Sequence, residues 1–343
     1  MRALLMAGGG GTRLWPLSTE DRPKQFLKLL SDKSLLRETY ERVRPATEDV
    51  FVAAAARHVA LVRQELPEIP EARILAEPAR RNSGPALLAA AMRFEEEGDP
   101  VTAAIPSDQT VADGEAFRRA LASAAALADR SSVVLLAVPP TRPETDFGYL
   151  EVTEPGGEGM EVLRFIEKPS PAEAEELVQA GRLWNAGIFV FRPSRLLAEA
   201  RRVASDLVAS LETYRSRQAS GDARAAAAAY EALPEISIDY AVMEKAAGVR
   251  AVPLRARWSD VGTWRAVREL RKASDESGNL IVSDAPVLAL GVRDSAIVVN
   301  ENGVLVLPFE REGELRSAVE RLRRGEKSRP NLEDTASRSR DRR

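Results

Sequence analysis

The chain has 343 residues and a formal net charge of −3, with 44% hydrophobic and 29% charged residues. This composition is ordinary for a globular protein, and its near-neutral charge gives no support for a nucleic-acid partner. The length exceeds the size at which one hydrophobic core keeps growing, so we expect a large domain and a smaller unit.

The chain contains no cysteine and a single histidine, His58. Disulfides, thiolate metal sites and cysteine nucleophiles are therefore excluded, and the composition is consistent with a cytoplasmic protein. We expect His58 to be a lone surface side chain rather than a metal ligand. No signal-peptide pattern is present and no apolar run reaches about 18 residues, so we expect neither secretion nor a membrane partner.

Strand-like and helix-like segments alternate in the first part of the chain. The strand-like segments are 3–7, 49–56, 72–77, 101–108 and 132–138, and the helix-like segments are 34–44, 57–66, 85–97 and 114–128. Short apolar runs separated by helices are typical of βαβ units, so the pattern predicts an α/β fold with a Rossmann-like, mostly parallel sheet flanked by helices. Ligands bind such sheets at the carboxyl ends of the strands.

The pattern changes from about residue 145. Segments 148–152, 162–168 and 186–191 are strand-like, 194–247 is mostly helical, 279–308 is rich in strands and 312–324 is helix-like. Asn302-Gly303 predicts the turn of a hairpin. We assign 1–272 to the main domain, 273–324 to a small strand-rich C-terminal unit ending in a helix, and 325–343 to a disordered tail.

Four consecutive glycines, Gly8 to Gly11, follow the first predicted strand. They do not fit the Walker A pattern, because no Gly-Lys pair follows. Arg13 stands where the dinucleotide fingerprint GxGxxG needs its last glycine, which makes a nicotinamide-dependent oxidoreductase a poor interpretation. A glycine-rich turn alone would explain the glycines but not the cations Arg13 and Lys24 nearby. Backbone N–H groups and two cations suit a polyphosphate.

The segment AGGGGTRLWPLSTEDRPKQFL resembles the signature of sugar-1-phosphate nucleotidylyltransferases, GGxGTRL…P…PK. Its LWPLS…PKQFL version is similar to that of the mannose-1-phosphate guanylyltransferases in particular. Further matches follow in the order of that family: EPARRNSGPA (77–86), PSDQ (106–109), FGYLE (147–151), FIEKP (165–169), LWNAGIFVF (183–191), SIDYAVMEK (237–245) and WSDVGTW (258–264). Together they cover roughly residues 1 to 310, and 1–272 would be the catalytic domain.

The resemblance implies a reaction in which mannose 1-phosphate attacks the α-phosphorus of GTP, giving GDP-mannose and pyrophosphate with Mg²⁺ as cofactor. The attacking phosphate oxygen is already anionic, so no serine, cysteine or histidine nucleophile is needed. Such a reaction requires in-line positioning and neutralisation of charge between two anionic reactants.

The resemblance also implies a nucleotide site. The metal ligands would be Asp108 and Asp260, since Mg²⁺ prefers hard oxygen ligands. In an isolated PSD segment, Asp108 would more simply be a helix cap or turn residue, but its pairing with the WSDVGTW motif favours the metal. Arg13 and Lys24 would hold the β- and γ-phosphates; they could instead be an ordinary pair of solvated surface cations, but their place in the glycine-loop motif favours the phosphate role. The remaining nucleotide contacts would come from Gly8, Gly9, Gly10, Gly11, Thr12, Asn82, Gly84 and Asp108, with Asn82 as the best side-chain candidate for guanine and Gly84 allowing close backbone approach.

The sugar phosphate would bind to a second set of residues. Lys168 would hold its phosphate, while Glu167 and Asn185 would bind hydroxyls and the Gly148 N–H would face the sugar. Glu167-Lys168 could instead be a charge pair at the end of a strand. Asp239 is a further sugar-site candidate, but it could also cap a helix.

Two departures from the family pattern are visible. Gln109 stands where the family usually has histidine after PSD, which leaves nearby nucleotide contacts open. The chain also ends before the isomerase domain of longer relatives, so we expect no phosphomannose isomerase activity.

Two alternatives stay open beside the leading hypothesis. One keeps the chemistry with another nucleotide or hexose 1-phosphate. The other is a non-catalytic regulatory subunit that binds sugar nucleotides, although such a subunit would be expected to lack a metal aspartate or a loop cation, and the candidates are all present here. The resemblance also favours a homodimer.

Overall fold

The computed structural model describes residues 1–9, 12–130, 133–154 and 159–324. The chain forms two compact units: Met1–Gly10 with Asp21–Val261, and Gly11–Glu20 with Gly262–Arg343. Gly10, Gly11 and the predicted tail at 325–343 lie outside the described residues. No helix in the described ranges has the length and apolar character needed to cross a membrane.

The first unit is built on a mixed sheet with the strand order β3-β2-β1-β4-β9-β6-β10-β8-β7. Its strands are β1 (Arg2–Met6), β2 (Asp49–Ala55), β3 (Ile74–Glu77), β4 (Thr102–Pro106), β6 (Val134–Val138), β7 (Gly148–Val152), β8 (Met160–Glu167), β9 (Leu183–Phe191) and β10 (Arg250–Pro253). β3, β2, β1 and β4 are parallel neighbours, as are β6 and β10, whereas β9 runs antiparallel to β4, β6 and β7. The predicted α/β fold is confirmed, and β7, β8 and β9 add its antiparallel part.

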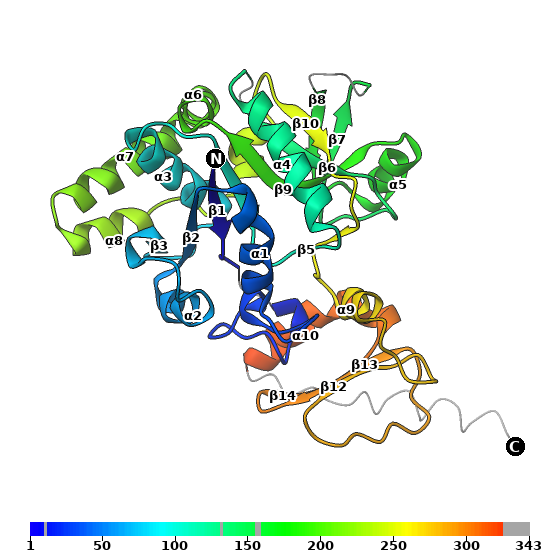
Figure 1. Cartoon of the computed structure of the whole chain (residues 1–343). Coiled ribbons are helices and arrows are strands. Elements are labelled where there is room, and N and C mark those ends of the chain that lie inside the picture. Colours follow the sequence, from blue (N-terminus) through cyan, green and yellow to red (C-terminus); the bar gives the residue numbers. More distant parts are fainter. Residues whose placement is uncertain (10–11, 131–132, 155–158, 325–343) are drawn as a thin grey trace, which may run out of the picture. The chain divides into compact units, whose positions relative to one another are not determined.

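Helices cover both faces of this sheet (Figure 1). They are α1 (Leu35–Val43), α2 (Val59–Glu65), α3 (Ser83–Glu96), α4 (Gly114–Ala128), α5 (Pro171–Gln179), α6 (Pro193–Val203), α7 (Ser205–Ala219) and α8 (Ala223–Glu231). Successive strand residues point to opposite faces. Leu5 therefore belongs to the hydrophobic core that includes residues of α1, α2 and α4. Leu4 belongs to a second hydrophobic core, which includes residues of α3, α6 and α7.

The carboxyl ends of β1 and β4 lie next to each other. The two strands are parallel neighbours in register, with Met6 opposite Pro106. Ser107 fixes the exit of β4, because its backbone N and its Oγ donate to the Met6 carbonyl oxygen at 3.2 and 2.9 Å. The glycine loop and Asp108 consequently start from adjacent points on one edge of the sheet, as the sequence predicts.

The second unit contains a small sheet and two helices. Its elements are α9 (Trp264–Arg271), β12 (Leu280–Ser283), β13 (Ser295–Asn300), β14 (Gly303–Pro308) and α10 (Leu315–Arg323). The predicted hairpin is present, but Asn300 pairs with Gly303, so the loop consists of residues 301 and 302 and the predicted turn is displaced by one residue. Gly303 has φ +149°, and a Cβ on it would lie 2.7 Å from the Trp15 ring.

The middle of the glycine-loop signature belongs to this second unit. The Trp15 carbonyl oxygen accepts a hydrogen bond from Trp264 Nε1 at 3.3 Å. The Pro16 carbonyl oxygen accepts from Asn300 Nδ2 at 3.0 Å and from Asn302 Nδ2 at 3.2 Å. Pro16 is therefore anchored by side chains almost three hundred residues away in the sequence, as the separations of 284 and 286 residues show.

Candidate active site

Gly8 and Gly9 line a cavity of about 150 Å³ at the carboxyl edge of the sheet. Arg57, Glu77 and Asn82 are among its other lining residues. A Cβ on either glycine would meet no atom within 4 Å, so protein packing does not require glycine here. Gly9 has φ +134°, a conformation that side chains other than glycine rarely adopt. The loop thus leaves open space above its backbone.

His58 lines the same cavity, and the prediction that it is a surface side chain is wrong. It is only 4% exposed, and its ring lies against Phe26 with 5.9 Å between the ring centroids. Gln25, the residue before Phe26, fixes that segment to the end of β1, because its Nε2 donates a hydrogen bond to the Ala7 carbonyl oxygen at 2.6 Å. The burial of His58 therefore depends on a segment more than thirty residues earlier, which the local sequence around His58 does not reveal.

Asn82 lines the cavity and caps α3. It has φ +66°, and its Oδ1 accepts a hydrogen bond from the Ser83 N–H at 2.8 Å. Gly84, two residues further on, lies against the backbone of a distant segment. A Cβ on it would lie 2.7 Å from the Ile236 carbonyl oxygen, which also accepts its N–H at 3.0 Å. The close approach that Gly84 allows is thus to the protein's own backbone, and it is not among the residues that line this cavity.

Glu77, at the end of β3, also lines the cavity, although no sequence motif assigns it a role. Its half-buried carboxylate accepts a hydrogen bond from Tyr230 Oη at 2.9 Å. Burial raises the pKa of Glu77 to about 7, although the Tyr230 hydrogen bond opposes the increase. It is the first residue of the segment EPARRNSGPA, and that position was the signal by which it could have been found.

Lys24 joins the two aspartates that the resemblance assigns to a metal. Its Nζ lies 2.9 Å from Asp108 Oδ2 and donates to the backbone carbonyl oxygen of Asp260. The short strands β5 (Thr110–Val111) and β11 (Trp258–Ser259) pair antiparallel, which brings these segments together from distant parts of the chain. The structure thus places Lys24 and both aspartate residues in one cluster.

Gln109 connects this cluster to the sheet. Its Nε2 donates to the Ala186 carbonyl oxygen at 2.8 Å, and its Oε1 accepts from Trp258 Nε1 at 3.0 Å. The amide therefore links β11 to β9 by donating and accepting at the same time. Where the family usually has histidine, the side chain in this chain is engaged by the protein itself.

The residues assigned to the sugar phosphate form a second cluster. Lys168 makes an ion pair with Glu167, and Asn185 Nδ2 donates to Asp239 Oδ1 at 3.1 Å. Gly148 stands opposite Glu167 in the β7–β8 pair, and a Cβ there would lie 2.7 Å from Glu167 Oε2. Glycine at this position lets the Glu167 carboxylate lie against the strand. The structure brings all five predicted residues together.

The carboxylates of this cluster are easier to protonate than isolated ones. Burial and the charge of Glu167 raise the pKa of Asp239 to about 7. Burial also raises the pKa of Glu167, against the effect of its ion pair with Lys168. The pKa of Lys168 is raised as well: burial lowers it, but the pairing with Glu167 outweighs burial. The cluster therefore combines a firmly charged ammonium with one acid, Asp239, that can donate or accept hydrogen bonds near neutral pH.

Arg13 is half-buried in the second unit, at the turn Thr12–Leu14. Gly10 and Gly11 and the side chain of Thr12 lie outside the described part of the chain.

A family model described as nucleotidyl transferase matches residues 2–277. The chain belongs to the nucleotidyl transferase family. This confirms the family resemblance that the glycine loop and the later motifs carry.

Curated relatives of this nucleotidyl transferase include the alginate biosynthesis protein AlgA of Pseudomonas putida. It is 38% identical over 319 residues, which cover 89% of this chain and 64% of that protein. The mannose-1-phosphate guanylyltransferase of Klebsiella pneumoniae is 33% identical over 351 residues, which cover 95% of this chain and 74% of that protein. The chain thus spans less than two thirds of the AlgA protein's length.

A solved structure from Thermus thermophilus, described as a mannose-1-phosphate geranyltransferase, superposes on this nucleotidyl transferase with a TM-score of 0.84. It has 37% sequence identity, and the match covers 94% of this chain and 99% of that chain.

Proposed function

We propose that this nucleotidyl transferase moves GMP from GTP to mannose 1-phosphate, giving GDP-mannose and pyrophosphate. The observation that carries the proposal is the cluster of Lys24, Asp108 and Asp260 on the sheet edge that also bears the glycine-loop cavity. The names of the relatives from Klebsiella and Thermus support mannose 1-phosphate as a substrate.

Guanine is proposed to bind in the glycine-loop cavity beside Glu77 and Asn82. The base presents the donors N1–H and N2–H₂ beside its O6 acceptor, whereas adenine presents an acceptor at N1. An ionised carboxylate accepts only, so it matches the guanine donors and not the adenine acceptor. Glu77 therefore joins Asn82 as a candidate for base recognition. The pKa of Glu77 is about 7, so bound guanine would favour the ionised form of this carboxyl group over the protonated form.

The triphosphate is proposed to lie between the glycine backbone and Lys24. The Lys24 ammonium compensates the carboxylate of Asp108 at 2.9 Å. A second cation near that carboxylate, such as a bound metal ion, would free the ammonium for the phosphates. Arg13 keeps the role that the motif resemblance gives it, on the β- and γ-phosphates.

Asp108 and Asp260 fit a divalent cation by their chemistry. Mg²⁺ is usually held by one or two carboxylates, with substrate phosphates and waters completing its shell. Within the described residues no group of three or more candidate metal-binding side chains gathers, and the substrate phosphates are proposed to complete the shell. When bound, the ion would neutralise the phosphates and polarise the α-phosphorus.

Mannose 1-phosphate is proposed to bind the cluster around Lys168. The ammonium would hold the phosphate, while Glu167, Asn185 and Asp239 would bind hydroxyls. One oxygen of the sugar phosphate attacks the α-phosphorus, a new P–O bond forms, and the bond to the β-phosphate oxygen breaks as pyrophosphate leaves. The protein supplies alignment and fixed charge, as is typical of transfers between phosphate groups.

A matrix of substrates tests this proposal. Pyrophosphate release is measured with GTP, ATP, dTTP, UTP and CTP against mannose 1-phosphate and glucose 1-phosphate, each with Mg²⁺ and with chelator. We expect metal-dependent release that is strongest for GTP with mannose 1-phosphate. Release with a different pair would keep the chemistry and change the base or sugar assignment. Binding of a sugar nucleotide without release from any pair would favour a regulatory subunit.

A homodimer in the cytoplasm is part of the same proposal. Size-exclusion chromatography with light scattering would test the oligomeric state, and a monomer at working concentrations would contradict it.

A further inference from the structure

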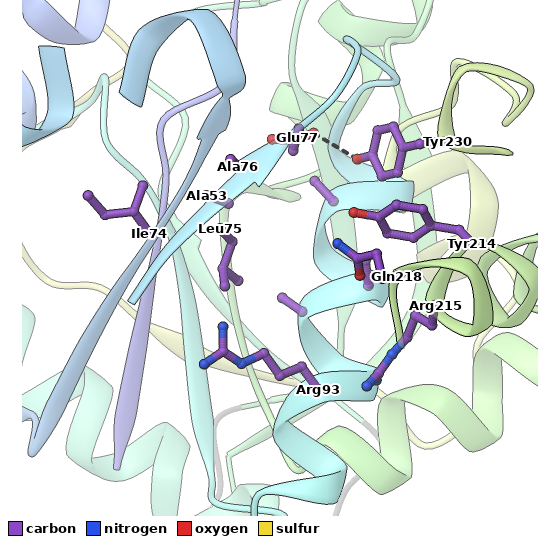
Figure 2. A pocket seen from close by; sticks show the side chains of 13 residues that line it. Ala53, Ile74, Leu75, Ala76, Glu77, Arg93, Tyr214, Arg215, Gln218 and Tyr230 are labelled. Carbon is purple, nitrogen blue, oxygen red and sulfur yellow. Dashed lines mark hydrogen bonds between the residues drawn. The ribbon is translucent and has the colours of Figure 1, made fainter. Parts of the chain in front are cut away.

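A second cavity, of about 280 Å³, lies in the first unit between β3, α3 and α7 (Figure 2). Much of its wall consists of small side chains: Ala53, Ala76, Ala86, Ala89 and Ala90. The cavity is open to solvent on one side, since its lining residues Ala76 and Gln218 are exposed, so a small molecule can enter it. Its volume is at the lower end of the range for small-molecule sites.

The two ends of the cavity differ in charge. Figure 2 shows Arg93 and Arg215 at one end and the Glu77–Tyr230 hydrogen bond at the other. Arg93 Nε is 2.7 Å from Glu97 Oε1, and Arg215 Nη2 is paired with Glu96. These glutamates fix the two guanidinium groups in place on the cavity wall.

One guanidinium nitrogen of Arg215 is left without a hydrogen-bond partner among the described residues. This nitrogen, Nη1, is buried. A buried donor without an acceptor is unfavourable, and in native proteins such groups are normally satisfied by protein, water or ligand. Because Nη1 is closed even to water, an acceptor in the cavity reaches it only when the Arg215 side chain turns toward the cavity that it lines, and an anionic acceptor would pair best with the guanidinium group.

The wall between the two ends suits a flat ring. Tyr214 packs edge-on against Tyr230, with 4.9 Å between the ring centroids, and Tyr214 and Gln218 both line the cavity. The alanines opposite present methyl groups rather than polar atoms. A planar ring fits between a row of methyl groups and an aromatic side chain, and Gln218 can hydrogen-bond to its edge.

We propose that this cavity is a binding site for a small metabolite with an anionic group and a planar ring that carries hydrogen-bond donors. The anionic group pairs with Arg215, the ring lies between the alanine wall and Tyr214, and a ring donor points to Glu77. Nucleoside monophosphates share this chemistry.

The cavity is also connected to the glycine-loop cavity. Glu77 and Ala86 line both. If Glu77 reads guanine, which rests on the proposed function, a ligand that donates to its carboxylate from the second cavity competes with the base for the same acceptor. Binding at the second cavity then weakens the binding of GTP, which raises the KM for GTP. By thermodynamic linkage, GTP weakens the binding of that ligand by the same factor as the ligand weakens GTP binding.

Titration calorimetry on the full chain tests the site, with GMP, AMP, UMP, CMP and inorganic phosphate as separate probes. Arg215→Ala removes the cation and Ala89→Leu fills the cavity without changing its charge. Arg217→Ala is the matched control, because Arg217 is an exposed arginine on the same helix that does not line the cavity. We expect at least one monophosphate to bind, about tenfold or more weaker in the first two variants, as loss of a charged hydrogen bond predicts, and unchanged in the control.

Three results would overturn the proposal: no saturable binding at millimolar concentrations, equal affinity in all four proteins, or phosphate binding as tightly as the monophosphates. These binding results do not depend on catalysis, so they remain readable if pyrophosphate release fails. If the site binds and the enzyme is active, the KM for GTP should rise with the bound probe in wild type and stay constant in Arg215→Ala. A constant KM in wild type would contradict the connection through Glu77.

Discussion

Lys24 Nζ lies 2.9 Å from Asp108 Oδ2, and the lysine is only 9% exposed. A charge held in so confined a place needs a compensating charge or ligand nearby. Asp108 provides that compensation, and the Asp260 carbonyl oxygen accepts a further hydrogen bond. The pair therefore holds in place the cation that the proposed reaction needs for its phosphates.

Replacing Lys24 with alanine should lower turnover by roughly 10²–10³-fold, because loss of a preorganised charge stabiliser typically has an effect of this size. Pyrophosphate release at saturating substrates measures it. Lys28→Ala is the control, since Lys28 is an exposed cation four residues along the same motif. Near wild-type turnover in Lys24→Ala would remove the lysine from the mechanism.

Replacing Glu77 with glutamine should reduce discrimination between GTP and ATP. The amide still accepts a hydrogen bond from Tyr230, but its NH₂ group faces the guanine donors. We expect the ratio of kcat/KM for GTP to that for ATP to fall about 10- to 100-fold, the range for a good base contact. An unchanged ratio would show that other groups read the base.

Stability should fall as pH rises toward and through neutrality. The pKa values of Glu77 and Asp239 are both raised to about 7, mainly by burial. Between about pH 4 and pH 7 the folded state therefore binds more protons than the unfolded state, so the free energy of unfolding decreases with pH.

Glu77→Gln should remove part of this decrease, because the amide has no proton to lose. Urea unfolding at pH 4 and pH 8 measures the free energy of unfolding. Between these pH values we expect it to fall less in the variant than in wild type, by on the order of 1 kcal/mol. Glu235→Gln, at an exposed position, is the control and should follow wild type. An equal change in the free energy of unfolding for wild type and Glu77→Gln between pH 4 and pH 8 would contradict the raised pKa of Glu77.

Replacing Gly303 with alanine should destabilise the second unit. The new Cβ would lie 2.7 Å from the Trp15 ring at a residue with φ +149°. Overpacking of this kind typically lowers stability by about 1–3 kcal/mol, and the strained backbone adds to it. Gly313→Ala is the matched control, since a Cβ there would meet nothing within 4 Å. Thermal denaturation compares them, and equal melting temperatures would contradict the packing of Trp15 on the hairpin.

The sequence by itself determined the alternation of strands and helices in the first part of the chain and the places where chemistry-bearing residues leave those strands. Apolar periodicity and glycine placement are local properties, so they predict β1, β4 and the loops that follow them. The ordered motifs also indicated the family, because seven matches in the same order as in that family are far more specific than any one of them. The motifs by themselves point to Lys24, Asp108, Asp260 and the Lys168 cluster.

Only the tertiary structure decided what those residues touch. Gly84 faces Ile236, Gln109 bridges Trp258 and Ala186, and His58 is covered by Phe26. Each of these contacts joins residues that are distant in the sequence, and no local pattern records which distant segment arrives at a given side chain. The role of Glu77 is of the same kind. Its raised pKa and its place on two cavities arise from burial beside Tyr230, 153 residues later in the chain.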